Sequence, residues 1–251
     1  MKAQLIDVDY ITKGGQAVIR LVMKRKRFFR VYDYGFEPYF YVGAVDLKKA
    51  EKELGEITAL EGNREIGVKR IETVKRELFG EEKELLRVFC WHPSHVPLLR
   101  ERVRGIGTAY EDDIPFARRY MIDKELEPFA LVDFEREGKR IVEIRGMESA
   151  PVKLNSFCFD IETYNPGGEP NAQKDPAIMI SYATSDGESG VLTYKKIKRK
   201  FVKFYDGERA MIDGFCSLLK EKDAELILGY NSAQFDLPYL KKRAEVNGTK
   251  L

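Results

Sequence analysis

The sequence contains few of the side chains from which disulfide frameworks and histidine- or cysteine-based metal sites are built. It has three cysteines and two histidines in 251 residues. Cys90, Cys158 and Cys216 lie far apart and form no C-x-x-C pair. We interpret them as small buried apolar residues of a protein in a reducing compartment. His92 and His95 are too few for a histidine-based metal cluster.

A strong excess of one charge and long apolar runs are also lacking. The net charge is only +2, although 33% of the residues are charged. Any contact with DNA must therefore come from local patches and not from an overall basic field. The N-terminus shows no signal peptide, and no apolar run is long enough to cross a membrane. These absences predict a cytoplasmic protein with no membrane partner.

Two acidic residues end an apolar run at 156–163. Alternate side chains of a strand point to the same face, so Asp160 and Glu162 should lie side by side. Neighbouring carboxylates repel each other unless a cation lies between them. Hard divalent ions with oxygen ligands, Mg²⁺ or Mn²⁺, would fill that role. The alternative is a strand end that carries two solvated acids, and this stretch alone leaves both interpretations open.

A third acid, Asp236, occupies the expected start of a helix. The preceding residues 226–228 have the pattern of a short buried strand, Pro238 falls in the first helical turn, and Leu240 and Ala244 follow at helical spacing. Taken alone, Asp236 would be interpreted as a helix N-cap.

The patterning predicts an α+β domain over residues 1–130 and a connector hairpin over 131–154, with a boundary near 149–151. In the first domain, strands are expected over 5–11, 17–23, 28–34, 36–42 and 85–91, and helices over 46–54 and 94–103, capped by Asp46 and Ser94.

Residues 155–251 predict an α/β domain in the order three strands, helix, strand, helix. Strands are expected over 157–162, 177–183, 190–194 and 226–230, and helices over 208–222 and 237–244. The basic run 195–203 lies between these elements. It is either a solvated loop or a segment that contacts phosphate.

The two acidic segments, D-I-E at 160–162 and N-x-x-x-F-D-x-P at 231–238, resemble the first two motifs of the DEDD 3′→5′ nucleases. Their form and order resemble the proofreading domain of family B DNA polymerases. The resemblance implies a ribonuclease H-like (DEDD exonuclease) fold for 155–251 and a two-metal site for Mg²⁺ or Mn²⁺. Its catalytic and metal-binding residues would be Asp160, which bridges the metals, Glu162 and Asp236. Asn231 and Phe235 would contact DNA.

Four further segments, 7–12, 38–39, 92–97 and 113–120, resemble the N-terminal domain of archaeal family B polymerases. In that family the matching residues form a pocket that captures uracil in the template strand. Here they are Tyr10, Pro38, Tyr39, Pro93, Val96, Pro97, Phe116 and Arg119. A flipped pyrimidine needs flat apolar walls, and a narrow pocket would exclude the methyl group of thymine. Arg119 would supply either a charge for the neighbouring phosphate or a brace for the pocket.

The family pattern also requires a third motif, Y-x-x-x-D, after the second. None follows Asp236, and the match from Tyr182 to Asp186 precedes it. We therefore expect an exonuclease domain that is truncated at its C-terminal end, and a chain that is inactive by itself.

The favoured hypothesis is the N-terminal portion of a DNA-directed DNA polymerase, a nucleotidyltransferase of DNA replication. Its implied partners are single-stranded template, the primer 3′ end, the remaining polymerase polypeptide and a sliding clamp. One alternative is a non-catalytic module that binds single-stranded DNA or uracil, or a subunit completed by a partner chain. Another is a stand-alone DEDD exonuclease whose third motif was lost or moved.

Overall fold

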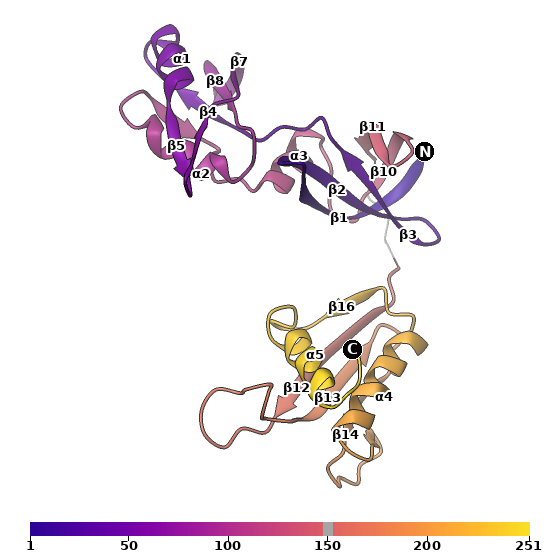
Figure 1. Ribbon diagram of the computed structural model, residues 1–251. Helices are drawn as coiled ribbons and strands as arrows, with labels where there is room; N and C mark the ends of the chain where they lie inside the picture. The colour runs from indigo at the N-terminus through magenta and orange to yellow at the C-terminus, as the bar shows by residue number, and fades with distance from the viewer. Residues whose placement is uncertain (148–152) are drawn as a thin grey trace. The chain divides into compact units, whose positions relative to one another are not determined.

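The computed structural model describes residues 1–147 and 153–251, and the chain divides into the units Met1–Val152 and Lys153–Leu251 (Figure 1). The boundary predicted near 149–151 lies outside the described residues. No helix among the described residues is both long enough and apolar enough to span a membrane.

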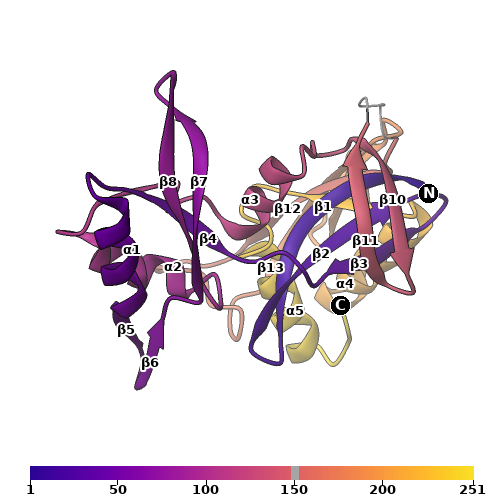
Figure 2. The ribbon, with the colours of Figure 1, turned by 90° about the horizontal axis from the view of Figure 1, so that it is seen from above.

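Five strands of the first unit close into a barrel in the order β1-β10-β11-β3-β2 (Figure 2). Alternate residues of these strands, such as Leu5 and Leu21, fill the interior. The strands are β1 (Lys2–Lys13), β2 (Gln16–Lys24), β3 (Phe28–Asp33), β10 (Leu131–Glu137) and β11 (Arg140–Gly146).

The hairpin predicted as a connector over 131–154 is formed by β10 and β11, but it belongs to this barrel. Val132 and Phe134 of β10 are buried in the barrel core, and β10 pairs with β1. This burial makes the hairpin an integral part of the first unit instead of a separate connector.

A second sheet of the first unit has the order β7-β8-β4-β9. Its strands are β4 (Tyr39–Gly43), β7 (Arg70–Leu78), β8 (Glu81–Phe89) and β9 (Thr108–Tyr110). The remaining elements are α1 (Leu47–Glu56), the hairpin β5 (Thr58–Glu61) and β6 (Arg64–Gly67), α2 (His95–Arg100), a 3₁₀ turn (Glu101–Val103) and α3 (Phe116–Asp123).

The predicted helix caps of this unit had different outcomes. Asp46 caps α1 and accepts a hydrogen bond from the backbone N–H of Lys49 at 3.0 Å, as expected. Ser94 occupies the N-cap position of α2 as expected, but its hydroxyl makes no capping bond and donates instead to the Glu61 carboxylate at 2.6 Å. The helix expected over 94–103 is divided into α2 and the 3₁₀ turn.

The second unit is a five-stranded sheet in the order β15-β14-β13-β12-β16. Its elements are β12 (Ser156–Thr163), β13 (Ala177–Thr184), β14 (Ser189–Thr193), β15 (Val202–Phe204), α4 (Glu208–Glu221), β16 (Leu226–Leu228) and α5 (Asp236–Val246). β12 is an internal strand, antiparallel to β13 and parallel to β16. The predicted order of three strands, helix, strand and helix is therefore present, with β15 as an unpredicted addition at the edge.

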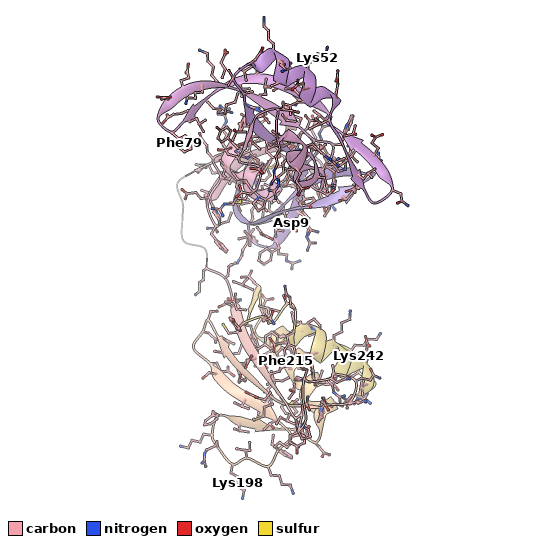
Figure 3. The ribbon with its side chains drawn as sticks, turned by 90° about the vertical axis from the view of Figure 1, so that its left-hand side faces the viewer. Asp9, Lys52, Phe79, Lys198, Phe215 and Lys242 are labelled. Atoms are coloured by element: carbon pink, nitrogen blue, oxygen red, sulfur yellow. The ribbon has the colours of Figure 1, made fainter. Side chains whose placement is uncertain are left out.

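Both helices of this unit pack on one face of the sheet. Phe157, Phe159 and Ile161 of β12 contact the core that α4 and α5 complete, and Phe215 of α4 lies at its centre (Figure 3). The alternation of β12 turns Asp160 and Glu162 to the opposite face, where both are exposed. Among the described residues of this unit, no helix packs on that face.

A buried ion pair joins the two helices. The side chains of Glu208 in α4 and Arg243 in α5 are 8% and 7% exposed. Glu208 Oε1 accepts from Arg243 Nε at 2.8 Å, and its carboxylate also accepts from Asn247 Nδ2 and the Ala177 backbone N–H, each at 2.8 Å. Burial by itself raises the pKa of Glu208, but these hydrogen bonds outweigh it and hold the pKa below its usual value. The pair therefore fixes α5, which begins at Asp236, against α4 and β13.

We expect Arg243→Met to lower the free energy of unfolding by about 3 kcal/mol at pH 7, because it leaves Glu208 buried without its cation. The folded-state pKa of Glu208 is lowered, so the contribution of the pair is complete above about pH 4.3 and is lost as the pH falls through the folded-state value. Urea unfolding at pH 7 and pH 3 measures this. Arg209→Met, at an exposed position of α4 next to Glu208, is the control and should change stability by less than about 0.5 kcal/mol. Equal losses in both variants would contradict the assigned role.

Candidate functional site

The first part of the site lies on the open face of β12. Asp160 and Glu162 are exposed there, and Ile161 between them is 7% exposed and packs in the core. Side chains of β12 therefore alternate between the two faces of the sheet, as the sequence predicted. In register across the sheet, Asp160 lies opposite Ser181 and Glu162 opposite Met179, neither of which is basic.

Asp236 approaches the same strand from the start of α5. It is 3% exposed, and its carboxylate accepts from the backbone N–H of Ile161 and from its own. Burial raises the pKa of Asp236, the negative charge of Asp160 raises it further, and the two backbone N–H groups only partly offset this. Asp236 thus lies close enough to Asp160 for their charges to interact.

The interpretation of Asp236 as a plain N-cap is wrong. α5 begins at Asp236 itself, its N-cap is Phe235, and no side chain makes a capping hydrogen bond there. A cap would leave the carboxylate at the solvent-exposed end of the helix. Here it is buried against β12 instead, which is unfavourable for the fold in the absence of a cation.

A tight turn between β16 and α5 brings Asp236 to this position. A Cβ on Gly229 would lie 2.9 Å from the carbonyl oxygen of Phe159, so only glycine allows this approach to β12. Asn231 then adopts a left-handed conformation with φ of 58°, and its carbonyl accepts from the N–H of Phe235 at 2.9 Å. The predicted DNA-binding residues Asn231 and Phe235 therefore belong to the turn that delivers Asp236, and both are surface-exposed.

The donor set suits a hard divalent cation, because all its ligands would be carboxylate oxygens. Within residues 1–147 and 153–251, however, no three His, Cys, Asp or Glu side chains are grouped closely enough to hold a metal ion. The contacts of Asp236 involve Asp160 and the backbone of Ile161. Glu162 shares the face of Asp160 and would have to turn toward that pair to complete the set.

The early Y-x-x-x-D match takes no part in this arrangement. The ring of Tyr182 stacks on Phe157 at 5.6 Å, on the core side of the sheet, and its hydroxyl donates to Glu188 at 2.9 Å. Asp186 pairs with Lys222 at 3.0 Å. These residues stabilise the turn between β13 and β14.

The first unit contains a cavity of about 440 Å³ that all eight residues of the predicted uracil pocket line. They come from β1, the start of β4, the loop and helix at 93–97, and α3. The cavity is also lined by Ser94, Arg100, Asp112, Asp113, Ile114 and Pro115. The structure thus brings together residues that are scattered over 110 positions of the sequence, from Tyr10 to Arg119.

Aromatic rings form the walls of this cavity. The rings of Tyr10 and Phe116 meet edge to face at 5.5 Å, and the Tyr39 hydroxyl donates to Asp123 at 2.6 Å. Burial raises the pKa of Tyr39, and the bond to Asp123 raises it further. The phenol is therefore a permanent donor that holds its ring in place.

Arg119 supports the cavity from behind. It is 5% exposed, lies 5.2 Å from the Tyr39 ring, and pairs with Glu111 and with Asp123 at 3.4 Å. Of the two roles that the sequence left open, this favours the brace, because the charge is already neutralised. Sequence reasoning missed Glu111 and Asp123; only the i, i+4 spacing of Arg119 and Asp123 could have indicated the second.

Comparisons of the sequence with a family model and with known proteins all lead to DNA polymerases. Residues 107–251 match the family described as DNA polymerase family B, exonuclease domain. The DNA polymerases of Thermococcus sp. (strain GE8) and Pyrococcus glycovorans are each 38% identical and cover 98% of this chain, with matches that span 13% and 30% of their own lengths. That of Archaeoglobus fulgidus is 39% identical over 96% of this chain and 30% of its own length.

A solved structure gives the same result. The family B DNA polymerase from the hyperthermophilic archaeon Pyrobaculum calidifontis superposes with a TM-score of 0.75 and 32% identity, covering 99% of this chain and 33% of that one. The chain therefore spans about a third or less of the length of these relatives.

We expect Asp236→Asn to stabilise the metal-free protein by about 1 kcal/mol at pH 7, because it removes a buried charge that lies close to Asp160. Since the folded-state pKa is raised, the native state binds more protons than the unfolded state between the two pKa values. Stability therefore falls as the pH rises through that window, and the gain should disappear below about pH 3.9. Urea unfolding in EDTA across this range measures it. Asp206→Asn, an exposed acid of the same unit, should have no comparable effect. A loss of stability in Asp236→Asn would show that the charge is not unfavourable.

Proposed function

The chain belongs to the family B DNA polymerases, and on that premise we propose that its 251 residues carry template-uracil recognition and part of a two-metal 3′→5′ proofreading exonuclease. The observation that supports the nuclease most directly is the approach of Asp236 to Asp160 and Ile161. Two segments that are distant in sequence meet there, and the Asp236 carboxylate is buried next to the negative charge of Asp160. A surface that only binds DNA does not require a buried pair of carboxylates of this kind.

Asp160, Glu162 and Asp236 would hold the divalent cations, Mg²⁺ or Mn²⁺. Metal ions in such a site activate water and stabilise the departing 3′ oxygen. The chain's own contribution is positional: β12 presents two carboxylates on a rigid internal strand, and the turn at 229–235 places the third. The antiparallel pairing of β12, β13 and β14, the parallel pairing of β16 with β12 and the order of the helices support the ribonuclease H-like assignment.

Asn231 and Phe235 are proposed to contact the 3′ end of the DNA. Both are exposed, and both lie in the turn that ends at Asp236. A primer end bound there would lie next to the carboxylates. The exposed ring of Phe235, 36% exposed and 5.4 Å from the Tyr239 ring, offers a stacking surface for a base.

The cavity of the first unit is proposed to hold uracil from the template strand. Its apolar walls suit a flipped pyrimidine, and Ser94, which also lines it, has a hydroxyl oxygen that can accept a hydrogen bond from a base edge. Arg119 would keep Tyr39 in position without contacting the base. Polymerisation, and partnership with the remaining polymerase polypeptide and a sliding clamp, follow only from family membership.

A second function, a non-catalytic module that binds single-stranded DNA, is favoured by one observation. Among the described residues, the three carboxylates are not grouped closely enough to hold a metal ion as they stand. In this case the cavity would carry the activity, and the acids would have only a minor effect on binding.

Metal binding separates the two functions. We expect Mn²⁺ at millimolar concentration to raise the thermal midpoint of the wild-type chain by several degrees, because the cation binds the native carboxylates and relieves their repulsion. Asp160→Asn should lose this shift, whereas Asp186→Asn, outside the site, should keep it. No shift in the wild-type chain would favour the non-catalytic module.

A polypeptide of these 251 residues should degrade DNA only slowly even with Mn²⁺, because no third motif follows Asp236 to complete the site. Fast degradation by it would contradict that expectation.

We expect the chain to bind a uracil-containing single strand at least about tenfold more tightly than the thymine version, because the methyl group would clash in the cavity. Val96→Gln and Phe116→Ala should each remove the preference, and fluorescence anisotropy with labelled oligonucleotides measures it. Val45→Gln, at a fully exposed position outside the cavity, is the control. Equal affinities for the two strands, or a preference that survives both cavity variants, would contradict the proposal.

A further inference from the structure

The most concentrated charge on the second unit is the segment Lys195–Lys203, called here the basic segment. It has six cations and no acid, and all six are exposed. Outside this segment, residues 153–251 have nine basic and fourteen acidic side chains. Figure 3 shows Lys198 in an outward-pointing group of side chains at the tip of this unit. The cations are Lys195, Lys196, Lys198, Arg199, Lys200 and Lys203.

None of these six cations has a carboxylate partner among the described residues of the chain. The neighbouring acids are already used: Glu188 pairs with Lys222, and Glu208 with Arg243. Six like charges within nine residues repel one another, and a polyanion would relieve that repulsion. The charge pattern therefore favours a phosphate-rich partner.

The segment is held by backbone bonds. The N–H of Val202 donates to the Arg199 carbonyl at 3.1 Å, and the N–H of Val191 in β14 donates to the Phe201 carbonyl at 2.9 Å. A Cβ at Gly190 would lie 3.0 Å from that carbonyl, which shows how closely the two strands approach. The second half of the basic segment is thus fixed to the sheet through β15.

Val202 and Phe204 of β15 lie on the same sheet face as the carboxylates, whereas Lys203 between them is in register with the core residue Leu192 and lies on the other face. The other five cations precede β15 in the loop at this edge of the sheet. Asp160 is in register with Ser181, Val191 and Val202 across β13, β14 and β15, and Glu162 with Met179, Thr193 and Phe204. Asp160 in β12 and Val202 in β15 lie three strand spacings apart, which is about 14 Å. Phe204 is 54% exposed at the end of the second row, and Phe201 is also exposed.

We propose that the basic segment, with Phe201 and Phe204, binds single-stranded DNA at the β15 edge of the sheet, from which the strand passes over Phe204 onto the open face that carries Asp160 and Glu162. The cations bind backbone phosphates, and the two exposed rings stack on bases, which a duplex would not offer. The direction of the strand rests on the nuclease function proposed above. The binding itself does not, because it requires neither metal nor uracil.

The test measures the affinity of the 251-residue chain for a fluorescein-labelled thymidine 20-mer by anisotropy, in EDTA, over a range of salt concentrations. The variant is the triple replacement Lys198→Gln, Arg199→Gln, Lys200→Gln. The control is Lys220→Gln, Lys241→Gln, Lys250→Gln, which removes the same charge from exposed positions of the same unit. Circular dichroism checks that both variants fold.

We expect the segment variant to bind at least about tenfold more weakly at low salt. The slope of log affinity against log salt should fall by about 2, because single strands contribute roughly 0.7 per phosphate contact. The control should stay within about twofold of the wild-type chain. Equal effects of the two triple variants, or no effect of either, would overturn the proposal.

Two further measurements identify the partner. Phe201→Ala with Phe204→Ala should weaken binding roughly tenfold and leave the salt slope unchanged, because stacking carries no charge. Phosphatidylserine vesicles, which offer negative charge but no bases, should bind the wild-type chain more weakly than the oligonucleotide does at equal phosphate concentration. If vesicles instead depend on the three cations and the oligonucleotide does not, the partner is an anionic membrane and the DNA proposal is wrong.

Discussion

The structure of the second unit depends on holding two like charges near each other. Asp236 is buried against β12 with its pKa raised by that burial and by Asp160. The turn before α5 holds Asp236 in this position: Gly229 allows the close approach to Phe159, and Asn231 reverses the chain direction. The buried pair of Glu208 and Arg243 then fixes α5 behind them. Buried charge that opposes folding is typical of functional sites.

Charges in this unit divide into two kinds. Glu208, Arg243 and Lys222 are neutralised by close partners and serve the fold. Asp160, Glu162 and the basic segment have no ion-pair partner within the described residues; the two acids lie on the open sheet face, and the basic segment lies at the β15 edge of the same sheet. Unneutralised charges of opposite sign on one sheet are what a polyanion and its metal ions would bind. In the first unit, by contrast, the Arg119 charge at the cavity is neutralised by Glu111 and Asp123.

The sequence predicted two parts of the candidate sites correctly: the shared face of the two β12 acids and the residues that line the cavity. Period-two alternation placed Asp160 and Glu162 on one face, and family resemblance identified eight residues that line one cavity. The role of Asp236 was misjudged at the level of local pattern, because a cap and a buried acid share the same sequence signal, and the turn before the helix decides between them. The β7–β8 hairpin was mostly missed because both faces of β7 are highly charged. β15 was missed because its strand forms only by pairing with β14.

The most direct test is the anomalous scattering of Mn²⁺ soaked into crystals of the 251-residue chain. The account predicts manganese bound by Asp160 and Asp236, with Glu162 turned to join them, because Asp160 and Glu162 share one face of β12 and Asp236 already interacts with Asp160. Manganese found only elsewhere, with the Asp236 carboxylate still packed against Ile161 and away from any ion, would contradict it.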